Sequence, residues 1–150
     1  MKKTPTIALV GNPNCGKSSL FNQLTGLRQK TGNFPGVTVD KKTGISQLDK
    51  RTEVNILDLP GTYSLYPKSL DEQVVLDVLL NPENPDFPDV TVVVVDASNL
   101  KRNLLLFSQI SDLGFHTILA LTMVDVAQKQ GIDIDPDRLS SLLGVPVVLL

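Results

Sequence analysis

The segment Gly11-Asn-Pro-Asn-Cys-Gly-Lys-Ser18 constrains this chain more than any other feature. It fits G-x-x-x-x-G-K-[ST], the pattern of a phosphate-binding P-loop. An apolar run, 7–10, precedes it, and the run 19–25 that follows has apolar residues at helical spacing. The segment is therefore predicted to lie at a strand-to-helix turn, where free backbone N–H groups and the helix dipole point at an anion.

Each fixed position of the loop has a physical role. Gly11 and Gly16 permit backbone conformations and a close approach that a Cβ would block. Lys17 brings a positive charge to the β- and γ-phosphates, and the Ser18 hydroxyl is a ligand for Mg²⁺. The other residues expected to contact the nucleotide here are Asn12, Pro13, Asn14, Cys15 and Ser19. A thiol near a helix N-terminus can have a lowered pKa, but we interpret Cys15 as a small residue that fills a loop position.

Composition bounds the class of protein. With 150 residues, 41% hydrophobic and 20% charged, the chain is expected to form one globular domain over 1–150. The net charge of −2 and the absence of a block of like charges argue against a nucleic-acid partner. A single cysteine indicates a reducing, cytosolic environment, and no signal peptide is visible. The longest apolar runs, such as 90–95, are too short to span a bilayer.

Strand-like and helix-like runs alternate along the chain. This predicts an α/β fold of three layers, α/β/α, with a mostly parallel six-stranded sheet and one antiparallel strand beside a polar turn at 49–51. Loops are expected at 29–35, 60–67 and 81–88. The final run reads as a strand without a covering element, so we expect a piece cut before the last loop and helix of its fold. The predicted strands are about 6–10, 37–47, 52–58, 90–96, 116–122 and 145–150, and the predicted helices about 17–25, 70–80, 100–113 and 135–143.

Two further segments suit the phosphates and their metal ion. Asp58-Leu59-Pro60-Gly61 follows an apolar strand, which places Asp58 to hold Mg²⁺ through water and Gly61 to offer its N–H to a γ-phosphate. A helix-capping Asp and a turn Gly are the alternative interpretation. In Gly36-Val37-Thr38, the Thr38 hydroxyl is positioned to reach Mg²⁺ when γ-phosphate is present, although one Thr alone reads as an ordinary strand residue.

The segment Thr122-Met123-Val-Asp125 is predicted to contact the base. A carboxylate at Asp125 accepts from N1–H and N2–H₂ of guanine, and adenine offers neither donor. The alternative is an exposed loop Asp after a core strand. GTPases usually have Asn where this chain has Thr122, and Thr cannot make the two-ended amide link between base and P-loop, so we expect weaker binding. Thr62 stands where Ras-type enzymes have a water-orienting Gln.

Together these residues resemble the N-terminal GTPase domain of ferrous iron transport protein B, a P-loop GTPase family of the TRAFAC class. The similarity covers nearly the whole chain. Its most specific parts are Gly-Asn-Phe-Pro-Gly-Val-Thr (32–38), Pro-Gly-Thr-Tyr-Ser-Leu (60–65) and Asp-Ala-Ser-Asn-Leu-Lys-Arg-Asn-Leu (96–104).

The resemblance implies a cytosolic G domain followed by a helical domain and a polytopic membrane segment for Fe²⁺ uptake, at the cytoplasmic face of the bacterial inner membrane. It implies slow GTP hydrolysis to GDP with Mg²⁺, held by Ser18, Thr38 and Asp58, and K⁺ near the phosphates with Asn14 as a ligand. A homo-oligomer is possible on the same grounds. The catalytic set carried over by position is Asn14, Lys17, Thr38 and Gly61.

Three functions remain open from the sequence. The first is a GTP-hydrolysing switch that gates an iron transporter, and the intact Lys17, Ser18, Thr38 and Asp58 favour it. The second is a binding module that holds nucleotide poorly, since Thr122 replaces the usual Asn and no base-contacting Ser-Ala loop is present. The third, a ribosome- or tRNA-associated GTPase, is opposed by the low net charge.

Overall fold

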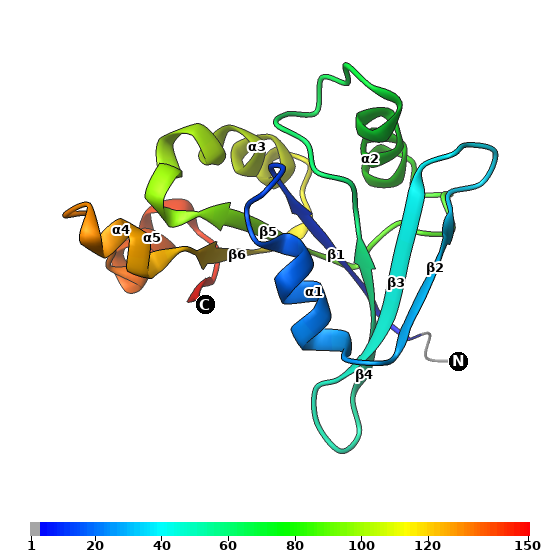
Figure 1. Ribbon diagram of the computed structural model, residues 1–150, viewed down its shortest axis with the longest axis horizontal. Coiled ribbons are helices and arrows are strands. Elements are labelled where there is room, and N and C mark those ends of the chain that lie inside the picture. The colour runs from blue at the N-terminus through cyan, green and yellow to red at the C-terminus, as the bar shows by residue number, and fades with distance from the viewer. Residues whose placement is uncertain (1–3) are drawn as a thin grey trace.

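The computed structural model describes residues 4–150, which form one seven-stranded sheet with helices on both faces (Figure 1). The strand order is β2-β3-β4-β1-β5-β6-β7. The strands are β1 (Thr6–Gly11), β2 (Gln29–Asn33), β3 (Asp40–Gln47), β4 (Glu53–Asp58), β5 (Val90–Asp96), β6 (His116–Thr122) and β7 (Val147–Leu149). The helices are α1 (Lys17–Thr25), α2 (Leu70–Leu80), α3 (Leu100–Asp112), α4 (Val124–Lys129) and α5 (Pro136–Leu143), with a 3₁₀ turn, η1, at Ala97–Asn99.

The sheet is parallel from β4 to β7, and β3 is the strand that runs the other way. β3 pairs antiparallel with both β2 and β4, while β1 pairs parallel with β4 and β5. The apolar strand β5 lies between β1 and β6, with Val93, Val94 and Val95 all buried. This position agrees with its continuous apolar run, because a central parallel strand is covered on both faces.

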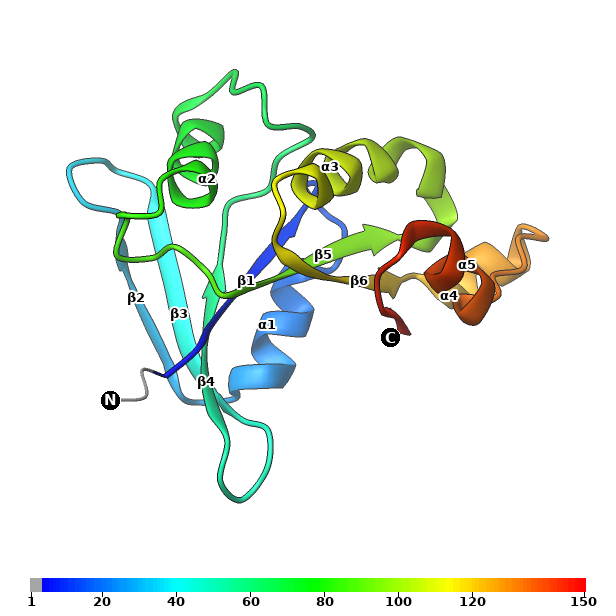
Figure 2. The same cartoon turned by 180° about the vertical axis from the view of Figure 1, so that it is seen from behind.

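Helices on opposite faces give the predicted three layers (Figures 1 and 2). On one face, Phe21 of α1 packs with Leu9, Val54 and Ile56 of the sheet. On the other face, side chains of α2 and α3 join a larger core that includes Ala8 and Leu57 of the same strands. Burial of a side chain such as Phe21 stabilises the fold by about 1.5–3 kcal/mol.

The prediction of six strands was wrong because the segment 29–35 was expected to be a loop. Residues Gln29–Asn33 form β2, an edge strand in which every residue is exposed. A strand with no buried face shows no alternation of apolar and polar residues, so its sequence carries no strand signal. The pairing is instead specified through the backbone of β3, with which β2 shares five register positions.

Strand β3 begins at Asp40 rather than at 37. The preceding residues form a tight turn in which Phe34 N–H donates to the carbonyl of Val39 (3.0 Å). The Phe34 and Val39 side chains are both buried in the larger core and fix the ends of this turn. Helix α4 and η1 were also not predicted, since segments of six and three residues are too short to show a helical period.

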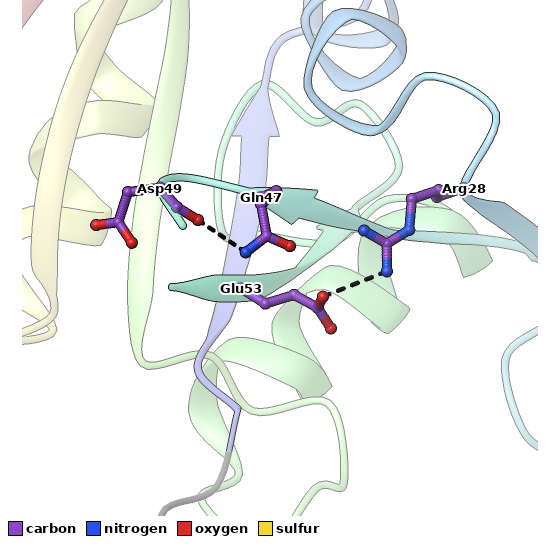
Figure 3. A network of polar contacts seen from close by, with 4 residues as sticks. All are labelled: Arg28, Gln47, Asp49 and Glu53. Atoms are coloured by element: carbon purple, nitrogen blue, oxygen red, sulfur yellow. Dashed lines mark hydrogen bonds and ion pairs between the residues drawn. The ribbon is translucent and has the colours of Figure 1, made fainter. Parts of the chain in front are cut away.

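The expected polar turn between β3 and β4 is present (Figure 3). Gln47 Nε2 donates to the carbonyl of Asp49 (2.8 Å), and Arg51 N–H donates to the Asp49 carboxylate (2.7 Å). Arg28 contacts Glu53 at 3.3 Å at the base of the hairpin. Because β4 begins at this hairpin and runs parallel to β1, the hairpin lies at the amino ends of the parallel strands.

Candidate functional site

The candidate site lies at the opposite edge, where the parallel strands end. The P-loop follows β1, Asp58 ends β4, and Thr122 ends β6. The register pairs Leu9 with Asp58 and Asp96 with Thr122, which brings these strand ends to one level. Ligands of open α/β sheets bind at this edge, in the crevice outside the carboxyl ends of the strands.

The backbone of the loop requires its glycines. Gly16 has φ 93°, in the left-handed region, and caps α1. A Cβ on Gly11 would lie 2.6 Å from Cys15 Sγ and 2.7 Å from the Val94 carbonyl oxygen, closer than real Cβ contacts allow. Asn14 also has positive φ, 64°, which Asn tolerates better than most residues. Both glycines therefore match the physical reasons for which the sequence predicted them.

An ion pair joins the two charged residues of the site. Lys17, the first residue of α1, donates from Nζ to Asp58 Oδ1 at 2.5 Å. The side chains are 10% and 5% exposed. The sequence assigned Lys17 to phosphate and Asp58 to Mg²⁺ and did not predict that they would pair. Each charge compensates the other where water is largely excluded.

Two cavities lie beside Lys17, and Asp58 lines one of them. The first, of about 270 Å³, is lined by the predicted residues Lys17, Ser18, Thr38, Asp58, Leu59 and Pro60, together with Val39, Asp40, Lys42 and Asp71. The second, of about 580 Å³, is lined by Asn12, Pro13, Asn14, Gly16, Lys17, Ser18, Ser19, Gly61, Asp71 and Met123. Lys17, Ser18 and Asp71 belong to both, so the cavities adjoin along the start of α1. Asp71, in the first turn of α2, is a lining residue that no feature of the sequence indicated.

The first cavity is suited to Mg²⁺. Two hydroxyls, of Ser18 and Thr38, and the carboxylate of Asp58 share its lining. Oxygen donors of this kind are the ligands that Mg²⁺ prefers. Within residues 4–150 there is no cluster of three or more His, Cys, Asp or Glu side chains placed to hold a metal ion. The lining also includes the carboxylates of Asp40 and Asp71, but the three Asp residues form no such cluster, so a metal ion here would depend on the hydroxyls, the Asp58 carboxylate and the ligand's own oxygens.

Some predicted residues lie outside these cavities. Gly36, Val37 and Asp125 line neither. Asp125 is exposed in the first turn of α4 rather than in a loop. Gly11 and Cys15 are buried beneath the loop surface.

Thr122 also lies beneath the P-loop, and its side chain forms a hydrogen bond with the loop backbone. Its hydroxyl donates to the carbonyl oxygen of Cys15 at 2.6 Å, and the Val95 carbonyl lies at 3.3 Å. The residue is 9% exposed. The Asn usual in GTPases links the base to the P-loop. Thr122 therefore makes the P-loop half of that link.

Thr62 is turned away from the cavities. It is 1% exposed, and its hydroxyl lies 2.7 Å from the Ser64 carbonyl and 2.9 Å from the Glu72 carboxylate. The Thr62 hydroxyl and the Lys68 N–H hold the pKa of Glu72 below its usual value. Ser69 caps α2 by accepting from the Glu72 N–H, and Glu72 lies three residues on, so the sequence carried a capping-box signal for the start of this helix, though not for the contact with Thr62.

Burial raises the pKa of the Cys15 thiol, even though Lys17 acts in the opposite direction. The side chain is 2% exposed. Desolvation of a thiolate outweighs the helix N-terminus here. The suggestion of a lowered pKa was wrong, and a small residue filling the loop agrees with the structure.

The doubly wound sheet, the P-loop at a strand-to-helix turn and the Asp at the end of the neighbouring strand define a domain with the P-loop GTPase fold. The family model described as Ferrous iron transport protein B matches residues 5–150, and the chain belongs to that family. The Fe(2+) transporters FeoB of Salmonella typhimurium and of Escherichia coli K12 are each 51% identical to the chain over its whole length. The chain spans 19% of each of these relatives.

Solved structures agree with this assignment. A mutant of the S. thermophilus NFeoB protein bound to mGDP has a TM-score of 0.89 at 47% identity and matches 99% of this chain and 55% of that one. The G domain of T. maritima FeoB has a TM-score of 0.87 at 42% identity, and the match covers 98% of this chain and 87% of that one. The cytosolic domain of L. pneumophila FeoB has a TM-score of 0.88 at 46% identity, and the match covers 97% of this chain and 60% of that one. Among the helices of residues 4–150, none combines the length and the apolar character needed to cross a bilayer.

Proposed function

We propose that this chain is a GTP-binding and GTP-hydrolysing switch domain, part of a longer Fe²⁺ transporter and located at the cytoplasmic face of the membrane. The observation that carries the proposal is the convergence of Lys17, Ser18, Thr38 and Asp58 on one cavity beside the P-loop. Each is the residue type that phosphoryl transfer needs at its position. The 51% identity to FeoB transporters, and the GDP-bound structures among its relatives, support the choice of nucleotide and of cargo.

In this proposal the chain acts by positioning and electrostatics. Lys17 leaves Asp58 and binds the β- and γ-phosphate oxygens, while the Gly61 N–H contacts the γ-phosphate. Ser18, Thr38 and Asp58 would hold Mg²⁺, which neutralises charge on the phosphate oxygens when bound. Thr62 cannot orient the attacking water, because its hydroxyl is engaged by Ser64 and Glu72. Slow hydrolysis is the expected consequence.

We propose further that K⁺ binds beside the phosphates with Asn14 as a ligand. Asn14 is exposed on the P-loop and is one of the residues that line the larger cavity. An amide oxygen there suits a monovalent cation, which supplies the positive charge that an arginine supplies in other GTPases.

Single-turnover hydrolysis of GTP with Mg²⁺, measured in KCl and in NaCl, tests the proposal. We expect phosphate release in both salts, faster in KCl, and an Asn14→Ala variant in which the two rates become equal. Lys17→Ala should lose turnover, whereas Lys30→Ala, at an exposed lysine of β2, is the matched control. Failure to bind guanine nucleotide at millimolar concentration would refute the proposal.

The second candidate is a nucleotide-dependent binding module with little or no hydrolysis. The engagement of Lys17 by Asp58 favours it, because the phosphate-binding ammonium already has a partner. The same assay separates the two functions: bound GTP without phosphate release in either salt indicates the module.

A further inference from the structure

We infer that Thr122 positions the P-loop and leaves the N7 atom of the guanine base without a hydrogen-bond partner at this position. The inference rests on the proposed function and deepens it, since it concerns how the same site reads its base. It makes nucleotide affinity and base recognition depend on different residues.

The first observation is the hydrogen bonding of the Thr122 hydroxyl. A hydroxyl carries one proton. Of its two neighbouring acceptors, the Cys15 carbonyl at 2.6 Å is much closer than the Val95 carbonyl at 3.3 Å. The proton is therefore donated to the P-loop, and no donor of this side chain remains for a ligand.

The second observation is the packing of the Thr122 methyl group. Its Cγ2 lies 3.2 Å from the point that a Cβ on Gly16 would occupy. Gly16 adopts φ 93° at the start of α1, so the methyl group packs against the residue that ends the phosphate loop. Both branches of the side chain thus contact the P-loop, and the residue is 9% exposed.

The chemistry of guanine gives the consequence. Its N7 and O6 atoms are acceptors, and its exocyclic amine is a donor. The Asp125 carboxylate recognises donors only, and the Met123 thioether that lines the larger cavity has no proton to give. An Asn at 122 would have two N–H groups, one for the Cys15 carbonyl and one for N7. The Thr keeps the first contact and lacks the second.

The test compares GDP with 7-deaza-GDP, in which N7 is replaced by C–H, by calorimetric titration in Mg²⁺. We expect the unmutated protein to bind both with affinities that agree within about twofold. Thr122→Val should weaken both nucleotides by the same factor, about tenfold for one lost hydrogen bond. Thr122→Ser should recover most of that loss. Thr122→Asn should create a preference for GDP over 7-deaza-GDP of up to about tenfold.

Thr117→Val is the matched control. Thr117 is a buried hydroxyl at the other end of β6, bonded to Thr91 at 3.1 Å. Its loss should leave the affinity for both nucleotides unchanged, and urea unfolding reports the folding of each variant. The comparison in the unmutated protein needs no variant at all.

A preference of the unmutated protein for GDP over 7-deaza-GDP of more than about fivefold would overturn this inference and leave the proposed function intact. An unchanged affinity in Thr122→Val would equally overturn the positioning role. If the unmutated protein bound neither nucleotide, the proposed function and this inference would both fail.

Discussion

Asp58 and a nucleotide phosphate compete for the Lys17 ammonium, and the Asp58→Asn substitution removes the carboxylate from this competition. In the structure, the two side chains are 10% and 5% exposed and lie 2.5 Å apart. Removal of one partner of a fully buried pair costs about 3–5 kcal/mol, because the other charge stays uncompensated. Lys17 also lines a cavity of about 270 Å³, so its ammonium is not fully enclosed by protein atoms and the cost lies at or below the lower end of this range. We therefore expect the domain without nucleotide to lose about 2–3 kcal/mol of unfolding free energy.

The same substitution should strengthen binding of nucleotide without metal. Lys17 no longer has to leave a carboxylate before it contacts a phosphate. A hydrogen bond to a charged group contributes about 1.5–3 kcal/mol, and 1.4 kcal/mol is a tenfold change in affinity. GDP in EDTA should thus bind about tenfold or more tightly to Asp58→Asn. The gain in affinity on adding Mg²⁺ should shrink, because one proposed metal partner is lost.

Urea unfolding without nucleotide, and GDP titration in EDTA and in Mg²⁺, measure both effects. Asp86→Asn is the matched control, since Asp86 pairs with Lys41 at 2.8 Å with side chains 17% and 26% exposed. That pair should contribute about 1 kcal/mol or less and should not affect GDP. If Asp58→Asn left both the stability and the GDP affinity in EDTA unchanged, the proposed competition between Asp58 and phosphate for Lys17 would be refuted.

Three other predictions follow from the site. Asp125→Ala should reduce the preference for GDP over ADP by about 2–5 kcal/mol, measured as the ratio of the two dissociation constants, and an equal affinity for both in the unmutated protein would contradict the premise. Glu72 has a lowered pKa in the folded state, so its contribution to stability is present above its ordinary value of 4.5 and is lost as pH falls through the lowered pKa. The difference in Tm between the unmutated protein and Glu72→Gln should therefore narrow on acidification. A Tm difference that grows on acidification would mean that folding raises the pKa of Glu72 instead of lowering it. Because burial raises the pKa of Cys15, a maleimide should react slowly with the folded protein and quickly in urea, and fast labelling of the folded protein would contradict the burial.

Much of the fold was predictable because its signals are local. The P-loop, the apolar strand β5 and the capped helix α2 have periodicity or end signals within a few residues. β2 has no such signal, since its five residues are all exposed and the strand pairs with β3 through the backbone. The turn that carries Thr38 was read as strand, because the burial of Phe34 and Val39 in the core depends on helices far away in the sequence.

The amino-acid sequence by itself determined the kind of loop, the residue types that suit a triphosphate and its metal ion, and the family, because these depend on glycines and short motifs whose spacing is visible along the chain. Only the tertiary structure decided which groups meet. Lys17 and Asp58 are 41 positions apart, and Thr122 and Cys15 are 107 apart, yet each pair is in hydrogen-bond contact. The reason is the sheet: parallel strands distant in sequence end at one edge, so their terminal side chains become neighbours that no local pattern can reveal.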